Sequence, residues 1–253
     1  MIVTGAALTN VGSSRTSNQD CILAGIWSEH CSMSVPYTFE FSDAVGEVVL
    51  VADGMGGHRA GEHASRVAVE AFLSKESALQ NPEELSGFLR IINRTVFDLA
   101  AKDAQLNGMG TTVAGLVCLS DTLLWFNVGD SKVFRFRDDF LRQLSVDDIA
   151  SVTHGSRKPG LTQALGGAPN FVDVHPHVGS DPMAVGWRYL ICSDGLTDVL
   201  PTLAIEQILA SSDEEAGLQL LDAALAQGAP DNVSVILITV KANDQLDGEV
   251  AHD

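Results

Sequence analysis

Short apolar runs bounded by polar turns recur along most of the chain. Residues 1–9 and 20–27 have the length and side-chain pattern of strands, and residues 46–52 read as a buried strand. Residues 28–46 show no regular pattern and are expected to form a loop or an irregular hairpin. Tight polar turns separate four further runs between residues 111 and 144, which predicts an antiparallel β-meander. Its expected strands are Thr111–Leu119, Thr122–Val128, Ser131–Arg137 and Phe140–Leu144, and later strands are expected at Arg188–Cys192 and Val233–Val240.

The period of an amphipathic helix is found in two segments of the first half of the chain. An apolar stripe runs from Ala64 to Phe72 at the i, i+3, i+4 and i+7 spacings of one helix face. A second helix is expected to start at Asn81-Pro82, because asparagine caps helices and proline is favoured in the first helical turn. These two helices are predicted to pack together on one face of a sheet. Two more helices are expected near 201–210 and 213–227.

Helices and strands are segregated along the chain rather than strictly alternating. This order argues against a doubly wound parallel sheet and favours an α+β fold. A chain of 253 residues with 45% apolar side chains can bury one sizeable core. We therefore expect a single domain over residues 1–241, followed by a polar tail over residues 242–253.

Composition and charge exclude several classes of protein. No apolar run approaches the roughly 20 residues that span a bilayer, and residues 1–10 lack the basic region of a secretory signal. A net charge of −18 repels nucleic acid and acidic membrane surfaces, so we expect a cytoplasmic protein that binds neither. The cysteines show no C-x-x-C spacing and are expected to be reduced thiols rather than a disulfide or a zinc site. They are Cys21, Cys31, Cys118 and Cys192.

Acidic residues beside glycine or asparagine follow several of the expected strands. The four pairs are Asp53-Gly54, Gly129-Asp130, Asp194-Gly195 and Asp231-Asn232. Each of them alone is more typical of a turn than of a ligand. Four carboxylates that converge on one rim of a layered fold would repel one another unless cations neutralise them. Because oxygen ligands select hard ions, the pattern favours Mg²⁺ or Mn²⁺ over zinc.

An arginine lies in the polar loop before another acid, in the segment Arg15–Asp20. Arginine can grip a phosphate bidentately, although Arg15 by itself is more typical of an ordinary surface residue. Taken together in chain order, the motifs resemble the PP2C-type, metal-dependent protein phosphatases (the PPM family), and most of all their bacterial branch. The resemblance spans nearly the whole chain and rests on Arg15…Asn18-Gln19-Asp20, Val51-Ala52-Asp53-Gly54-Met55-Gly56-Gly57-His58, Gly110-Thr111-Thr112, Asn127-Val128-Gly129-Asp130-Ser131, Ser193-Asp194-Gly195 and Asp231-Asn232.

The resemblance implies both a fold and a set of residue roles. The fold would be a four-layer α-β-β-α sandwich, with two antiparallel sheets flanked by helix pairs. Two Mn²⁺ or Mg²⁺ ions, with a possible third, would bind at the carboxylates, and a hydroxide bridging two ions would attack phosphorus in line. The implied roles are a bridging ligand at Asp53, first-ion ligands at Asp194 and Asp231, a second-ion carbonyl at Gly54, a third site at Asp130 with Asp194, water-mediated contacts from Asp20 and Gln19, phosphate binding by Arg15, and a structural strand start at Gly110-Thr111-Thr112.

The chain departs from the family pattern at a few positions. Gln19 stands where many members have glutamate, so it can hold a water but adds no charge. Met55 stands where some members have a histidine that protonates the leaving group, and the general acid is left unassigned, since His58 is more typical of a cap. Residues 145–160 occupy the place of the family's flap and are short. They contain His154, Arg157 and Lys158, for which we favour a solvated loop over substrate contacts, and His175-Pro176-His177 is read as an edge-strand feature rather than a metal pair.

These features predict an enzyme that hydrolyses phosphoserine and phosphothreonine in proteins. Two alternatives remain open: a catalytically weak or inactive regulatory module with the same fold, and an enzyme for small phosphate esters. By resemblance, the partners would be phosphorylated proteins and a bacterial Ser/Thr kinase that the enzyme opposes. The segment from Leu161 to Gly167 is somewhat similar to members that work beside type VI secretion kinases. We expect the protein to be a monomer.

Overall fold

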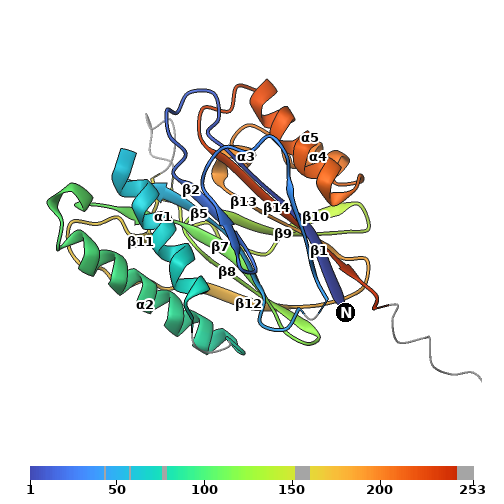
Figure 1. The fold of residues 1–253 in the computed structure, drawn as a ribbon, viewed down its shortest axis with the longest axis horizontal. Helices are drawn as coiled ribbons and strands as arrows, with labels where there is room; N and C mark the ends of the chain where they lie inside the picture. Colours follow the sequence, from blue (N-terminus) through green and yellow to red (C-terminus); the bar gives the residue numbers. More distant parts are fainter. Residues whose placement is uncertain (43, 57, 76–78, 152–159, 244–253) are drawn as a thin grey trace, which may run out of the picture.

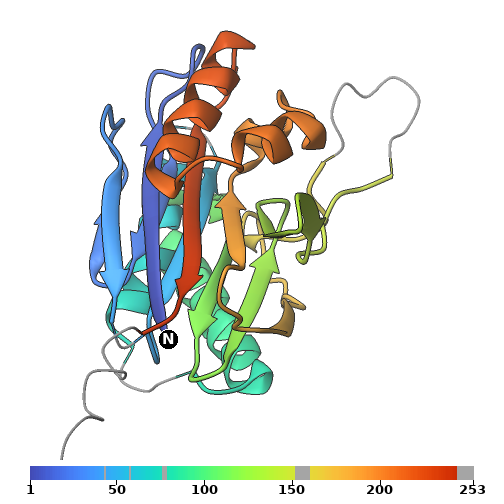
Figure 2. The same ribbon diagram turned by 90° about the vertical axis from the view of Figure 1, so that its right-hand side faces the viewer.

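The computed structural model describes residues 1–42, 44–56, 58–75, 79–151 and 160–243. Two antiparallel sheets lie face to face, and helices cover their outer faces (Figure 1). After a turn of 90°, the orange helices of the C-terminal part of the chain lie in front of the strands (Figure 2). The first sheet has the order β10 (Phe140–Gln143), β9 (Lys132–Arg137), β13 (Arg188–Cys192), β14 (Val233–Lys241), β1 (Ile2–Asn10), β4 (Tyr37–Phe41).

The second sheet contains most of the strands from the N-terminal half of the chain. Its order is β11 (Leu165–Gly166), β6 (Gly110–Thr111), β5 (Val48–Met55), β7 (Val113–Cys118), β8 (Thr122–Val128), β12 (His177–Pro182), with β2 (Asp20–Ala24) paired to β5 and β3 (Trp27–Glu29) paired to β2. The α+β sandwich expected from the sequence is therefore confirmed.

Each sheet has its own pair of main helices. The helices α1 (His58–Leu73) and α2 (Pro82–Ala100) pack on the second sheet, as expected, whereas α4 (Thr202–Ile208) and α5 (Asp213–Ala226) cover the first. Two short helices, α3 (Asp194–Thr197) and the 3-10 turn η1 (Ala104–Leu106), complete the described helical elements. At the start of α2, the Asn81 side chain accepts a hydrogen bond from the Glu84 amide at 2.9 Å, so the predicted cap is confirmed.

The central strands are apolar on both faces, because each sheet is covered on both sides. In β5, Val49 and Val51 face the core between the sheets, while Leu50 faces the core beneath α1 and α2. In β14, Ile236 faces the core between the sheets, and Leu237 packs under α5. Burial on both faces explains why these strands read as continuous apolar runs in the sequence.

The expected β-meander is wrong at its middle turn. The hairpins β7–β8 and β9–β10 form, but β8 belongs to the second sheet and β9 pairs with β13 in the first. The chain changes sheets at Gly129, whose φ of +100° is disfavoured for other residues. A Cβ at this position would come within 2.7 Å of Thr112, so glycine is required there. The crossing leaves Asp130 at the gap between the two sheets.

Two edge strands were not predicted from the sequence. β4 lies within residues 28–46, where a loop or an irregular hairpin was expected, and it pairs with β1. Tyr37 in β4 stacks on Trp27 with 3.9 Å between ring centroids, which attaches this edge to β3. β12 begins at His177 and lies at the end of the second sheet. Only an edge-strand feature at the histidine pair was expected here, and of the two histidines His177 lies in the strand while His175 precedes it.

Candidate metal centre

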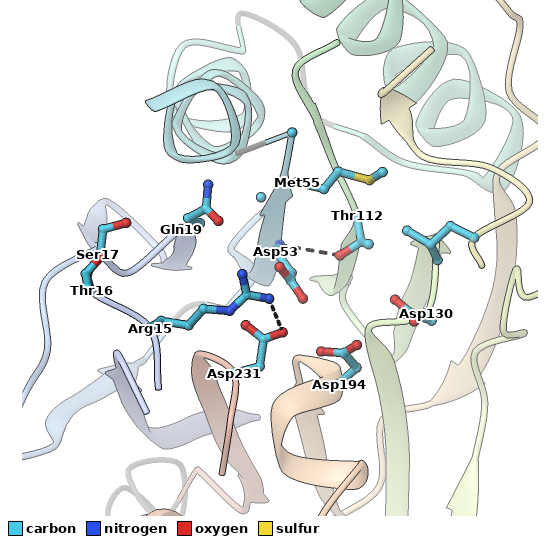
Figure 3. A pocket seen from close by; sticks show the side chains of 13 residues that line it. Arg15, Thr16, Ser17, Gln19, Asp53, Met55, Thr112, Asp130, Asp194 and Asp231 are labelled. Carbon is cyan, nitrogen blue, oxygen red and sulfur yellow. Dashed lines mark hydrogen bonds and ion pairs between the residues drawn. The ribbon is translucent and has the colours of Figure 1, made fainter. Parts of the chain in front are cut away.

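The predicted site residues other than Asp20 meet in one cavity of about 320 Å³ at the end of the sandwich (Figure 3). Four carboxylates, those of Asp53, Asp130, Asp194 and Asp231, line it. They come from both sheets and point toward one another across the cavity. The other lining residues are Arg15, Thr16, Ser17, Gln19, Gly54, Met55, Gly56, Thr112 and Leu161.

Strand ends position these acids. Asp53 and Gly54 are among the last residues of β5. Asp194 is the first residue of α3, two residues after the end of β13, and Asp231 lies just before β14. Because β5 belongs to one sheet and β13 and β14 to the other, the packing of the two sheets brings the acids together. Gly54 lies against Gly61 of α1 so closely that a Cβ would come within 2.2 Å of the Gly61 carbonyl oxygen. Close packing against α1 therefore fixes the position of the Asp53-Gly54 segment.

Two threonines support Asp53, one at the end of β6 and one between β6 and β7. The Thr112 amide and the Thr111 hydroxyl both donate to the Asp53 carbonyl oxygen, at 2.8 and 3.0 Å. Thr112 also bonds to the hydroxyl of Ser131, beside Asp130, at 2.7 Å. These contacts connect two of the carboxylate-bearing turns. They agree with the structural role expected for Gly110-Thr111-Thr112.

Asp20 lies behind the cavity and is completely buried. It pairs with Asp53 in the β2–β5 ladder. Its Oδ2 accepts hydrogen bonds from the hydroxyls of Ser193 at 2.9 Å and Ser234 at 2.6 Å. Its Oδ1 is buried and has no hydrogen-bond partner among the residues that the structure describes. A buried carboxylate oxygen without a donor is costly, and a water held by a cation would satisfy it.

Burial, together with repulsion between carboxylates, raises the pKa values of Asp20 and Asp53. Burial raises the pKa of Asp20 to about 7, against the two serine hydroxyls that lower it. Burial also raises the pKa of Asp53 well above its usual range, and repulsion by Asp20, Asp194, Asp231 and Asp130 adds to the rise. Divalent cations would reverse this cost, because they stabilise the ionised carboxylates. The donor set consists of oxygen atoms only, which fits Mn²⁺ or Mg²⁺.

Among the described residues that line this cavity, Arg15 is the cationic one. Its Nη2 donates to Asp231 Oδ2 at 2.7 Å, and the side chain is 50% exposed. The hydrogen bond to Asp231 raises the pKa of the guanidinium, and attraction to Asp53 and Asp194 adds to the rise. The charge therefore stays on Arg15 at any pH at which the protein is folded. An exposed guanidinium at the mouth of a carboxylate cluster is well placed to meet an incoming anion.

Some supporting residues were not predicted. The hydroxyls of Ser193 and Ser234 donate hydrogen bonds to Asp20. The side chain of Asn232 is hydrogen-bonded to the loop that carries Arg15. Asn232 Oδ1 accepts from the Gln19 amide at 2.8 Å, and its Nδ2 donates to the Ser17 carbonyl at 3.1 Å. In the sequence, the only signal for Asn232 and Ser193 is that they adjoin Asp231 and Asp194.

Several candidate residues do not contribute a described contact to the site. His154, Arg157 and Lys158 lie outside the described residues, as does the side chain of His58. His177 bonds to Asp148 at 2.8 Å rather than sharing a ligand with His175.

The cysteines are all free thiols, as expected. Cys21, Cys118 and Cys192 are buried, and burial raises the pKa of each to about 12. A thiol with so high a pKa is a poor nucleophile at neutral pH. None of the four lines the cavity. The site is therefore built for carboxylate chemistry rather than for a cysteine nucleophile.

Comparisons with known proteins agree with this geometry. The family model "Protein phosphatase 2C" matches residues 38–227. The serine/threonine phosphatase Stp of Listeria innocua is 33% identical over 216 residues, covering 76% of this chain and 83% of its own length. A crystal structure of the Mycobacterium tuberculosis serine/threonine phosphatase PstP/Ppp superposes with a TM-score of 0.78 at 27% identity, covering 96% of this chain and all of the other.

A second solved structure bears on the metal. The catalytic domain of a serine threonine protein phosphatase PstP, in complex with 2 manganese ions, superposes with a TM-score of 0.77 at 28% identity. It matches 96% of this chain and 100% of the other chain. The family model covers residues 38–227 and so leaves out Arg15, Asp20 and Asp231. The fold nevertheless brings these residues to the other acids: Arg15 and Asp231 line the same cavity, and Asp20 pairs with Asp53.

Proposed function

Because the chain belongs to the protein phosphatase 2C family, we propose that it is a metal-dependent protein serine/threonine phosphatase. The observation that carries this proposal is the convergence of four carboxylates from the ends of two sheets on one cavity, with an arginine at its mouth. Such a cluster is suited to divalent cations and to a phosphate group. Hydrolysis of phosphoserine and phosphothreonine is the reaction that joins the two.

The residues divide into those that hold cations and those that support them. Asp53 would bridge two Mn²⁺ or Mg²⁺ ions, with Asp194 and Asp231 on the first and the Gly54 carbonyl on the second. Asp130 with Asp194 would offer a third site. Asp20, whose Oδ1 is buried without a described donor, and Gln19 would hold waters of these ions. When bound, the cations lower the pKa of a water and offset the charge of the phosphate.

The protein's own groups orient the reaction. Arg15 would bind the phosphate oxygens and steer phosphorus toward the carboxylates. Asn232 would keep the Arg15 loop in place through its bonds to Gln19 and Ser17. Thr111 and Thr112 would hold the backbone of Asp53 in place through their hydrogen bonds to its carbonyl oxygen. No side chain is assigned as the general acid, since Met55 carries no proton to donate.

Replacing Arg15 with alanine is expected to lower kcat/KM for a phosphothreonine peptide about 100-fold, because a charge-assisted contact to phosphate contributes about 1.5–3 kcal/mol. Arg15→Lys should recover only part of this loss, since lysine lacks the planar fork. Steady-state kinetics of both variants measures the effect. Arg66→Ala is the matched control: the Arg66 side chain is 46% exposed and its partner is Glu70, away from the cavity. Activity of Arg15→Ala within threefold of the wild type would contradict the assignment.

The test of the proposed function is hydrolysis of p-nitrophenyl phosphate and of a phosphothreonine peptide, each with Mn²⁺ and with EDTA. We expect turnover of both substrates with Mn²⁺ and none with EDTA, restored by added Mn²⁺. The same assay with free phosphoserine separates a phosphoprotein phosphatase from an enzyme for small esters, which would prefer the free amino acid. A folded protein without turnover at any Mn²⁺ or Mg²⁺ concentration would instead favour the regulatory module.

The cellular role is proposed from the family alone. The substrates would be phosphorylated proteins, and the opposing enzyme would be a bacterial Ser/Thr kinase. A kinase linked to type VI secretion is one candidate for this enzyme. We propose that the chain acts as one domain over residues 1–241 and as a monomer in the cytoplasm. No helix in the described ranges is long and apolar enough to cross a membrane.

A further inference from the structure

A second cavity of about 500 Å³ adjoins the metal centre. Met55 and Leu161 line both cavities and so form the wall between them. The second cavity is otherwise lined by residues between Thr162 and His175 and by Asp148. None of the residues predicted from the sequence to bind metal or phosphate lines it. We call it the flanking pocket.

The far wall of the flanking pocket is held in place by α2. Asn93 is completely buried; its Oδ1 accepts from the Gly166 amide at 2.8 Å and its Nδ2 donates to the Val172 carbonyl at 2.9 Å. Arg90 donates to the Val174 carbonyl at 3.3 Å, and the guanidinium of Arg94 lies 3.5 Å from the ring centroid of Phe171. The segment that forms this wall is therefore anchored at several points. A wall that is anchored in this way can select a ligand by shape, because little ordering is needed on binding.

The polar side chains at the floor are already hydrogen-bonded to one another. Asp148 Oδ1 accepts from Gln163 Nε2 and from His177 Nε2, both at 2.8 Å. Asp148 Oδ2 accepts from the Gly129 amide at 2.8 Å. The Gln163 amide bonds to both the N–H and the carbonyl of His175, at 2.9 and 3.1 Å. Two kinds of side chain form the surface that remains to meet a ligand. Thr162, Asp173 and His175 are polar and exposed to solvent. The apolar part is formed by Met55, Leu161, Ala168 and Val172, with Ala164 and Val174 buried beneath it.

We propose that the flanking pocket binds an aliphatic side chain that lies next to the phosphorylated serine or threonine in the substrate protein. This inference rests on the proposed function, since it requires the phosphate to lie in the metal centre. The two cavities share a wall, so a chain whose phosphate is in the first can place a neighbouring residue at the second. Successive residues of an extended peptide are about 3.3 Å apart and alternate in direction, so a near neighbour of the phosphoresidue can enter.

The hydrogen bonds already made by the charged Asp148 favour an aliphatic side chain over a polar one as the occupant of the flanking pocket. Asp148 accepts hydrogen bonds from three groups, so its charge is already shared with donors of the protein. A polar side chain that reached the floor would lose water where Asp148 and Gln163 are already hydrogen-bonded, while the other polar side chains of the lining, Thr162, Asp173 and His175, are exposed and remain hydrated. An aliphatic side chain loses nothing by leaving water and gains contact with the lining. The flanking pocket therefore gives the enzyme a preference for certain residues beside the phosphorylated one, whereas the metal centre contacts only the phosphate.

The experiment compares phosphothreonine peptides that carry either leucine or alanine at one position, from three residues before to three residues after the phosphothreonine. We expect kcat/KM of the wild type to be about tenfold higher with leucine at one or two of these positions, as is usual for a side chain filling an apolar pocket. Val172→Arg and Ala168→Trp, which place a charge or a bulky ring in the pocket, should each abolish this preference. Val185→Arg is the matched control, because Val172 and Val185 are 58% and 57% exposed and Val185 lies outside the pocket.

Hydrolysis of p-nitrophenyl phosphate, which has no flanking residue, reports separately on the metal centre. A wild type that hydrolyses it and the peptides but shows no leucine preference at any position would overturn the inference and leave the proposed function intact. So would a preference that persists in a pocket variant that still hydrolyses p-nitrophenyl phosphate. A wild type that hydrolyses nothing would instead refute the proposed function. If one pocket variant fails to fold, the other decides the matter, with thermal melting as the check.

Discussion

Asp194→Asn is expected to lower kcat/KM about 1000-fold, because the loss of a cation ligand removes several kcal/mol of transition-state stabilisation. The change keeps the shape of the side chain and removes only its charge. Asp194 also repels Asp53 and Asp20 in the folded protein, as their raised pKa values show. The variant without metal should therefore be at least as stable as the metal-free wild type. The gain in Tm on adding Mn²⁺ should shrink strongly.

Asp181→Asn is the matched control for this prediction. Asp181 and Asp194 are both 7% exposed, so the two changes remove the same charge at the same degree of burial. Asp181 lies in β12, where it accepts from Arg135 Nη1 at 2.7 Å and from the hydroxyl of Tyr189 at 2.8 Å. Leaving Arg135 without its partner should cost about 3 kcal/mol of the free energy of unfolding.

The two variants should thus show opposite behaviour. Asp181→Asn is expected to be less stable and active, and Asp194→Asn stable and inactive. Thermal melting with and without Mn²⁺, together with kinetics on p-nitrophenyl phosphate, measures both properties. Asp194→Asn that kept more than a tenth of the wild-type kcat/KM would exclude this residue from the metal centre.

The metal-free protein is expected to lose stability as the pH rises from about 4 to 8. The pKa of Asp20 is raised from an unfolded value near 3.8 to about 7, so the folded state holds a proton that the unfolded state has lost. The stability that this proton provides is complete below the unfolded pKa and disappears as the pH rises through the folded pKa. At about 1.4 kcal/mol per pKa unit, the contribution of Asp20 is on the order of 4 kcal/mol, and Asp53 acts in the same direction.

Asp20→Asn isolates this contribution. The asparagine can still accept from Ser193 and Ser234, but it does not titrate. Urea unfolding in EDTA at several pH values should give a shallower decline with pH for the variant than for the wild type. Mn²⁺ should reverse the trend in the wild type, since its stabilising effect increases as the carboxylates ionise. Parallel pH profiles for the two metal-free proteins would contradict the raised pKa of Asp20.

Much of this architecture is encoded in short stretches of sequence. The start of α2 follows from Asn81 and Pro82, because a cap and a fixed φ act within a single turn. The strand β5 follows from an unbroken apolar run, and the acids that end it and its neighbours follow from their place beside glycine or asparagine. These signals are local, so they survive without any knowledge of the partner strands.

Pairing between distant segments was decided only in the folded molecule. The chain gives no local sign that Ile2 lies opposite Lys241, or that Gly129 carries the chain from one sheet to the other. The same holds for the buried contact of Asp20 with Ser193 and Ser234, which are more than 170 positions away. Such contacts depend on how two sheets pack, and packing depends on all of the apolar faces at once. The sequence alone therefore determined which residues are the candidates for metal and phosphate binding, whereas sheet packing decided how they meet, what holds them and that a second pocket opens beside them.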